Sequence, residues 1–227
     1  MTTTAVQDYL KAIYELSRDD EPAATSAIAD RLGLAAGSVT GMLKRLAEQG
    51  LIEHVPYYGA RLTRGGAREA VRLIRRHRIL ELFLVEVLGC GWDEVHEEAE
   101  RLEHVVTDRL IARMAAVLGD PEEDPHGAPI PAVGGAFRER RFPTLGEIEV
   151  GAVAVVRRVP DEDAAALRYL AELELVPGAE LELLERAPFN GPLRVLLAGS
   201  ERIVGAELAG MLEVEPVRST RRSRSDG

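Results

Sequence analysis

The stretch TSAIADRLGLAAGSVTGMLKRLAEQG, residues 25–50, contains two short apolar repeats separated by a glycine. Apolar residues recur at helical spacing in both repeats, at Ile28, Ala29 and Leu32 and again at Val39, Met42, Leu43 and Leu46. Gly33 lies between the repeats and can adopt the left-handed conformation that closes a tight turn. The arrangement predicts a helix-turn-helix, with Thr25 or Ser26 capping the first helix and a second helix beginning near Ala36.

The segments on both sides complete a winged helix. Upstream, apolar residues at helical spacing predict a helix over residues 5–17. Downstream, residues 51–55 and 60–63 are two short strand-like runs around a turn, which predicts the wing. The following helical pattern, residues 67–88, is apolar nearly all round, as in helices that are buried against another chain. A winged-helix domain followed by dimerisation helices is therefore expected.

The second helix of the motif has the side chains that a recognition helix needs. Small residues at its start let a helix enter the major groove, while hydroxyl and basic groups contact the DNA backbone. No Arg, Asn or Gln precedes Lys44 on this helix, so methyl, hydroxyl and water contacts together with DNA shape would carry base preference. With one wing residue, the candidate DNA contacts are Ala36, Gly37, Ser38, Thr40, Lys44, Arg45 and Arg61. The alternative is a winged helix used for protein contacts.

The charge distribution agrees with DNA binding at the N-terminal end. The formal net charge is −10, but residues 1–78 carry 12 Lys and Arg against 9 Asp and Glu. A cluster within that range either reaches phosphate or forms a solvated helix face: Arg72, Arg75, Arg76 and Arg78. The single Cys90 excludes a disulfide framework and fits a reducing compartment. With no export signal or membrane-spanning run evident, we expect a cytoplasmic protein without a membrane partner.

The C-terminal third has a different character. Pro and Gly are concentrated between residues 119 and 143, which indicates a linker. Beyond the linker, β-rich runs at 152–156, 178–184, 193–197 and 212–217 and a short helix over 161–173 predict a small β-barrel. The predicted fold class is thus α+β. The predicted domains are 1–72 (winged helix), 73–141 (helical metal-binding and dimerisation domain with linker), 142–217 (small β-barrel) and 218–227 (disordered tail).

Three histidines and three glutamates follow on two neighbouring helical segments. They are His77, Glu81, His96, Glu100, Glu103 and His104. The last four fall on one stripe of a single predicted helix. Each pair alone is typical of an ordinary i, i+4 helix contact, but together they flank an apolar core, where an uncompensated charge is costly. We interpret the set as ligands of a divalent cation.

Two other functions would use these residues differently. A metallohydrolase would use Glu97 or Glu98 as a base on a bound water, but the sequence has no His-Glu-x-x-His motif and no second acid–base constellation. A winged-helix sensor of organic ligands would leave the carboxylate and histidine stripe without a role. We therefore expect a metal-dependent DNA-binding protein and not an enzyme.

The order of the motifs resembles the diphtheria-toxin-repressor family of metal-dependent bacterial repressors. The matching features are the winged helix, Arg76-His77-Arg78-x2-Glu81, Val95-His96-x3-Glu100-x2-Glu103-His104, Pro125-His126-Gly127-x-Pro129-Ile130-Pro131 and a terminal barrel. The resemblance covers nearly the whole chain. It implies a homodimer that binds a pseudo-palindromic operator in double-stranded DNA when charged with Fe(II) or Mn(II), and a C-terminal domain similar to SH3 and FeoA modules.

In that family one metal site joins the first helix to the motif helix, which here implies Asp8 with Glu100, Glu103 and His104. Iron-responsive members have Met and Cys where this chain has Asp8 and Glu100, whereas manganese-responsive members have the acids. An oxygen-rich site without thiolate or thioether also suits Mn(II) by ligand chemistry. Shorter manganese regulators carry a further acid one turn along the first helix. Lys11 takes that place here, which argues against a tightly paired dinuclear centre.

The family has two patterns for a second site, and both remain open for this sequence. One uses His77, Glu81 and His96 with polar groups of the barrel domain. The other uses Glu81 with a linker Cys-Pro-His and a barrel Asp, where this chain has Asp124-Pro125-His126. The matching barrel acid is Asp161, with Asp163 as its rival. A solvated loop histidine is the alternative role for His126.

These observations predict a cytoplasmic, dimeric, Mn(II)-activated transcriptional repressor of metal-uptake genes. An iron-dependent repressor of the same fold is the alternative. Co(II), Zn(II) or Cd(II) would act as surrogate ions.

Overall fold

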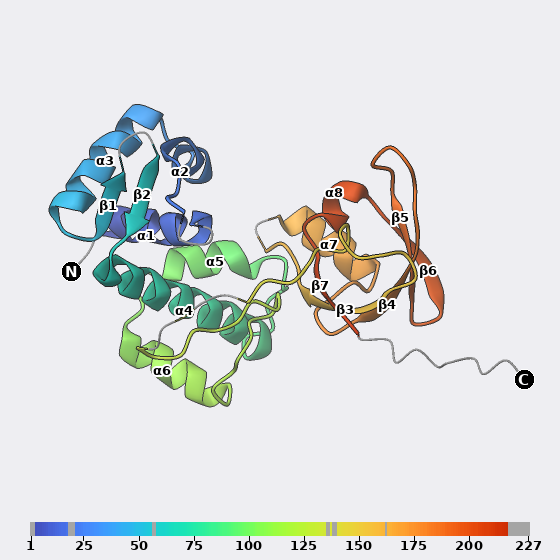
Figure 1. The fold of residues 1–227 in the computed structure, drawn as a ribbon. Coiled ribbons are helices and arrows are strands. Elements are labelled where there is room, and N and C mark those ends of the chain that lie inside the picture. Colours follow the sequence, from blue (N-terminus) through green and yellow to red (C-terminus); the bar gives the residue numbers. More distant parts are fainter. Residues whose placement is uncertain are drawn as a thin grey trace, which may run out of the picture. The chain divides into compact units, whose positions relative to one another are not determined.

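The computed structural model describes residues 3–17, 21–55, 58–134, 137, 140–161 and 163–217. The chain divides into two compact units. The first unit comprises Met1–Leu80, Ala99–Asp120 and Ile130–Arg138, and the second comprises Glu81–Glu98, Pro121–Pro129 and Glu139–Gly227. Two helices, α4 and α5, contribute residues to both units (Figure 1).

The first unit begins with the predicted winged helix. Its elements are α1 (Thr4–Leu16), α2 (Thr25–Leu32), α3 (Ala36–Glu48), β1 (Ile52–Val55) and β2 (Gly59–Leu62), with β1 and β2 paired antiparallel. Their apolar faces meet in one core, which includes the fully buried Leu10, Ile13, Ile28, Leu43 and Leu46. Gly33 ends α2 with φ +64°, as a left-handed cap requires. The predicted cap of α2 is wrong: Ala24 is the N-cap, without a side-chain hydrogen bond, and the helix already includes Thr25.

Three further helices follow the winged helix, and two of them carry four predicted metal ligands: His77 and Glu81 on α4, and His96 and Glu100 on α5. The three helices are α4 (Arg64–Glu86), α5 (Val95–Leu102) and α6 (Asp108–Val117). The prediction of one continuous helical stripe is wrong in part, because α5 ends at Leu102, and Glu103 and His104 lie in the turn after it. The predicted domain boundary after residue 72 falls inside α4 and stays a prediction.

Two members of the arginine cluster of α4 are buried, whereas Arg72 is exposed. Arg76 and Arg78 are each 7% exposed. Arg76 donates to the main-chain oxygen of Glu103 at 3.0 Å and pairs with Asp108 at 2.7 Å. Hydrogen bonds from Arg72, which has the larger effect, and from Arg76 lower the pKa of the Asp108 carboxyl. These contacts hold the turn between α5 and α6 against α4.

The C-terminal part of the second unit is a five-stranded antiparallel sheet in the order β6-β5-β4-β3-β7. The strands are β3 (Val153–Arg158), β4 (Glu180–Arg186), β5 (Leu193–Leu197), β6 (Ser200–Val204) and β7 (Glu213–Pro216). Helix α7 (Ala164–Glu172) packs on it through Leu167 and Leu170, and α8 (Ala206–Ala209) through Ala209. The sequence prediction missed β6 and α8. The predicted tail, residues 218–227, lies outside the described residues.

No helix in the described ranges is long and apolar enough to cross a membrane.

Candidate metal centres

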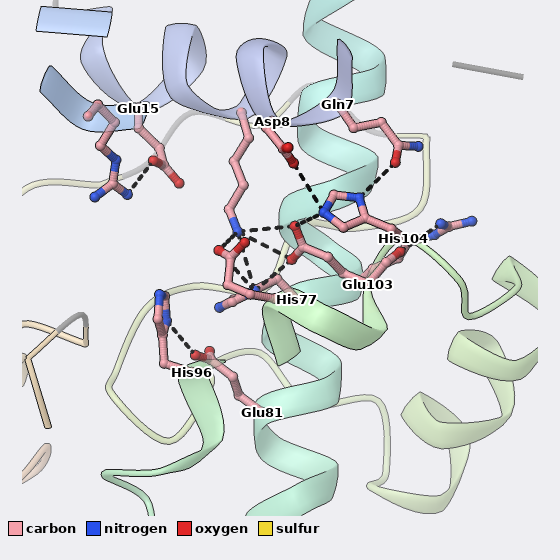
Figure 2. A network of polar contacts seen from close by, with 12 residues as sticks. Gln7, Asp8, Glu15, His77, Glu81, His96, Glu103 and His104 are labelled. Atoms are coloured by element: carbon pink, nitrogen blue, oxygen red, sulfur yellow. Dashed lines mark hydrogen bonds and ion pairs between the residues drawn. The ribbon is translucent and has the colours of Figure 1, made fainter. Parts of the chain in front are cut away.

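The first candidate centre lies in the first unit, between α1 and the end of α5. Glu100, Glu103 and His104 each offer a ligand atom, and these atoms all lie within 4.8 Å of one another. Asp8 of α1 completes the group, because its Oδ1 is 3.1 Å from Nε2 of His104 (Figure 2). The structure therefore brings together the four residues that the sequence assigned to the first site.

Burial makes it costly to keep several negative charges in this cluster. Glu103 is 0% exposed, and Asp8 is about one-third exposed at its side chain. Desolvation raises the pKa of Asp8, the nearby His104 opposes that rise, and Glu100 and Glu103 add to it. Carboxylates gathered in a poorly solvated place require a compensating cation. Oxygen and imidazole donors of this kind suit a borderline or hard divalent ion.

His104 is oriented by a residue that the sequence analysis did not identify. Its Nδ1 lies 2.8 Å from Oε1 of Gln7, which precedes Asp8 on α1. An acceptor at Nδ1 places the ring proton on that nitrogen and directs the Nε2 lone pair to a metal, as outer contacts of metal-bound histidines commonly do. The turn that carries His104 is held in addition by the contact of Arg76 with the Glu103 carbonyl.

Lys11 lies among these carboxylates. Its ammonium is 2.5 Å from Oε1 of Glu100 and 3.2 Å from Oε2 of Glu103. Burial of the ammonium opposes its charged form, but Glu103 and Glu100 outweigh that effect and raise the pKa of Lys11. Lys11 is therefore charged in this cluster.

His77 also contacts the first cluster. Its Nδ1 is 2.6 Å from Oε2 of Glu103 and 3.3 Å from the ammonium of Lys11. The side chain is 5% exposed. His77 thus contacts the Glu103 carboxylate on the side that faces Lys11.

The second candidate centre surrounds Glu81 in the second unit. Glu81, Asp124 and His126 are all buried and have ligand atoms within 4.8 Å of one another. Glu81, His96 and Asp161 form a second such group. The Glu81 carboxylate is common to both groups and lies 3.2 Å from Nδ1 of His96 (Figure 2). Four other predicted ligands, His96, Asp124, His126 and Asp161, therefore gather around the Glu81 carboxylate.

His126 is a buried residue of this centre and not a solvated loop residue. It is 0% exposed, its ring stacks on Trp92 and its Nε2 donates to the main-chain oxygen of Trp92 at 2.8 Å. Its Nδ1 is 3.9 Å from Oε2 of Glu81 and has no hydrogen-bond partner among the described residues. A buried imidazole whose second nitrogen is fixed by a carbonyl is suited to bind a metal through the first.

The loop that carries His126 is fastened by backbone contacts. Oδ1 of Asp124 accepts hydrogen bonds from the amides of His126 and Ala128, each at 2.9 Å. Gly127 has φ +85°, and a Cβ there would lie 1.9 Å from the carbonyl oxygen of Arg157, so only glycine fits. The amide of Val159 donates to the His126 carbonyl at 3.0 Å. The loop therefore packs directly on β3.

Of the two rival barrel acids, Asp161 lies at the centre. Asp163 is exposed and caps α7, with its Oδ1 accepting from the amides of Ala165 and Ala166. That role matches the preference for Asp at helix N-caps and explains the residue without a metal.

The predicted DNA contacts lie on an exposed surface of the winged helix. Those exposed are Ala36, Gly37, Ser38, Lys44, Arg45 and Arg61. Thr40 is half-buried, and its hydroxyl donates to the carbonyl of Ala36 at 2.9 Å, which leaves its lone pairs as acceptors. The surface is consistent with a recognition helix and wing.

Family models match three consecutive parts of the chain. They are the N-terminal DNA-binding domain of iron-dependent repressors over residues 1–60, the metal-binding and dimerisation domain of these repressors over residues 63–132, and the FeoA domain over residues 144–216.

Curated relatives match over most of their length. The iron-dependent repressor IdeR of Mycobacterium tuberculosis is 32% identical over 223 residues, which span 92% of this chain and 96% of IdeR. The diphtheria toxin repressor of Corynebacterium glutamicum is 34% identical over 220 residues, or 92% of this chain and 95% of that repressor.

Solved structures are similar over the same extent. A manganese-dependent transcriptional repressor in complex with manganese has a TM-score of 0.86 and 39% identity, covering 93% of this chain and 100% of that one. ScaR with bound Cd2+ has a TM-score of 0.80 and 32% identity, covering 93% of this chain and 99% of ScaR. Sequence, fold and the clustered ligands agree, and the chain belongs to the diphtheria toxin repressor family of metal-dependent, DNA-binding transcriptional repressors.

Proposed function

We propose that this repressor is activated by Mn(II) and controls genes for metal-ion uptake. The observation that carries the choice of metal is the donor set of the first centre, which consists of three carboxylates and one imidazole and contains no sulfur. Such a set favours Mn(II) by ligand type, because softer ions gain most from thiolate and thioether ligands. The similarity to the manganese-dependent repressor supports the same choice.

Activation would depend on how α1 is held relative to α5. Asp8 belongs to the winged helix, whereas Glu100 lies in α5 and Glu103 and His104 lie in the turn after it. A bound ion supplies a charge that draws all four donors together. Asp8 would then fix the winged helix against α5, and a homodimer would present both recognition helices at half-site spacing on a pseudo-palindromic operator. The ion must bind this arrangement more tightly than an open one.

For the second centre we propose the ligand set Glu81, Asp124, His126 and Asp161, with His96 beside Glu81. The buried His126 Nδ1 close to Glu81 supports it. His77 is assigned to support Glu103 in the first centre. Asp161 and Asp163 give a matched pair of variants, because both precede α7 but only Asp161 belongs to the cluster.

We expect Asp161→Ala to weaken binding of the second ion by at least about tenfold, because a direct ligand should matter no less than an outer contact. Asp163→Ala should keep both ions and lose about 1 kcal/mol of stability, since it removes a helix cap. Isothermal titration with Mn(II) and thermal melts measure the two effects. If Asp163→Ala lost the second ion and Asp161→Ala kept it, the ligand would be Asp163 and the proposal for Asp161 would be wrong.

The DNA contacts of α3 are proposed to be contacts with phosphates. Arg45→Ala should weaken all operators about equally and reduce the slope of log affinity against log salt by about one, because one phosphate charge is no longer neutralised. The Thr40 hydroxyl would turn from the Ala36 carbonyl to donate to a phosphate. Thr40→Ala should then weaken operators alike without changing that slope, since the hydroxyl is neutral. Fluorescence anisotropy on operators that differ in base sequence tests both; a changed base preference would contradict the assignment.

The experiment that tests the function is a titration of operator binding against Mn(II), Fe(II) and Zn(II) under anaerobic conditions, with the free concentration of each ion buffered. We expect activation by Mn(II) at free concentrations where Fe(II) gives little. Activation by Fe(II) at its own cellular level in preference to Mn(II) would favour the iron-dependent alternative, which the similarity to IdeR keeps open.

A further inference from the structure

Lys11 occupies one side of the first centre. Its ammonium is within 3.3 Å of atoms from three different side chains, those of Glu100, Glu103 and His77. Asp8 and His104 occupy the other side, and Glu103 faces both, because its Oε1 lies 3.7 Å from Nε2 of His104. The side chain of Lys11 is 10% exposed, so water contributes little to the solvation of its charge.

The charges of the centre balance for one divalent ion. Asp8, Glu100 and Glu103 carry three negative charges, and Lys11 neutralises one of them. Glu15, another acid that acts on Lys11, is already paired with Arg31 at 2.7 Å. Two negative charges remain, which is the charge that one divalent cation compensates. A second divalent ion would leave the centre positive and would lie next to an ammonium.

We propose that the ammonium group of Lys11 takes the place of a second metal cation in the first centre and limits this centre to one metal ion. The inference rests on the proposed metal-binding function of Asp8, Glu100, Glu103 and His104. The ammonium takes the place between Glu100, Glu103 and His77 that a second ion would need, and it lies one helical turn from Asp8 on the same face of α1. An acid at position 11 would instead supply a carboxylate to that place.

The test counts Mn(II) ions in the first centre alone. The background variant is His126→Ala with Asp161→Ala, which removes two ligands of the second centre. Equilibrium dialysis with elemental analysis gives the number of ions per protomer, and electron paramagnetic resonance distinguishes a single Mn(II) from two ions coupled through shared carboxylates. In this background we expect one uncoupled Mn(II) per protomer, and two coupled ions after Lys11→Glu.

Charge reversal elsewhere provides the control. Arg113→Glu makes the same change at an exposed position of α6 and should leave one uncoupled ion. Two coupled ions in the background variant, or no coupled pair after Lys11→Glu in a folded protein, would overturn the role of Lys11. No bound ion in the background variant would instead refute the first centre itself, so the two failures are distinguishable.

Lys11→Gln tests the same inference without adding a ligand, should Lys11→Glu fail to fold. Without metal, this variant should melt about 5 °C lower, because Glu103 and Glu100 lose their cation. One Mn(II) should then bind at least about tenfold more tightly, since the ammonium no longer competes for the carboxylates. An unchanged affinity for Mn(II) together with an unchanged melting temperature would show that Lys11 is not a cation of the centre.

Discussion

Replacing Asp8 by Ala should abolish Mn(II)-dependent operator binding while leaving the dimer intact. Asp8 is the one proposed ligand of the first centre that belongs to the winged helix, and its Oδ1 lies 3.1 Å from Nε2 of His104. Outer contacts of metal ligands already contribute ten- to a hundredfold to metal affinity, so loss of a direct ligand should reduce it by more than about a hundredfold. The remaining ligands, Glu100, Glu103 and His104, would no longer connect an ion to α1.

Two measurements separate this effect from misfolding. Anisotropy with labelled operator at fixed free Mn(II) gives DNA affinity, and sedimentation gives the oligomeric state. Asp30→Ala, which removes an exposed acid from the neighbouring α2, is the matched control and should bind the operator normally. Normal Mn(II) activation of Asp8→Ala would refute the bridging role of Asp8, and loss of the dimer would show that the residue acts on assembly.

The double variant Asp8→Met with Glu100→Cys should change which metal activates the repressor. It keeps Glu103 and His104 but replaces two oxygen donors with thioether and thiolate sulfur. Soft sulfur ligands favour Fe(II), Co(II) and Zn(II) over Mn(II). We expect the preference for Fe(II) relative to Mn(II) to rise by at least about tenfold, equivalent to about 1.4 kcal/mol.

Operator binding against buffered free metal, measured anaerobically for the native protein and the double variant, provides the comparison. Asp8→Asn serves as a control, because it removes the same charge without adding sulfur: Glu100 keeps the negative charge that a metal-bound Cys thiolate would carry. It should weaken all metals without changing their order. An unchanged metal order in the sulfur variant would place selectivity elsewhere, with the Glu81 centre as the first place to test.

Local sequence patterns determined the elements of the winged helix. Apolar spacing over 25–50 and a glycine at position 33 predicted α2, the turn and α3, since a helix and its left-handed cap depend on residues close together in the chain. The same patterns located most strands of the C-terminal sheet. They failed where the signal is short, at β6 and α8, and at the cap of α2, where Ala24 and not a hydroxyl residue precedes the helix.

The chemistry of the candidate centres was also present in the sequence, as residue types and as a resemblance to a family. The sequence did not show how these residues come together in space. Helical spacing placed four predicted ligands on one stripe, yet α5 ends at Leu102, and Glu103 and His104 lie in the turn after it, where Arg76 donates to the Glu103 carbonyl. The sequence already favoured Asp161 over Asp163, and the folded chain adds that Asp163 is used as a helix cap while Asp161 lies near Glu81 and His96.

The tertiary structure alone decided which charges meet. Lys11 and Glu103 are 92 positions apart, and neither the burial of the ammonium nor its contact with two glutamates follows from a local pattern. His126 likewise reads as a loop residue in sequence, but packing against Trp92 buries it and fixes its ring. Local periodicity reports which face of one element is apolar, whereas the charge balance of a buried site depends on which elements pack together.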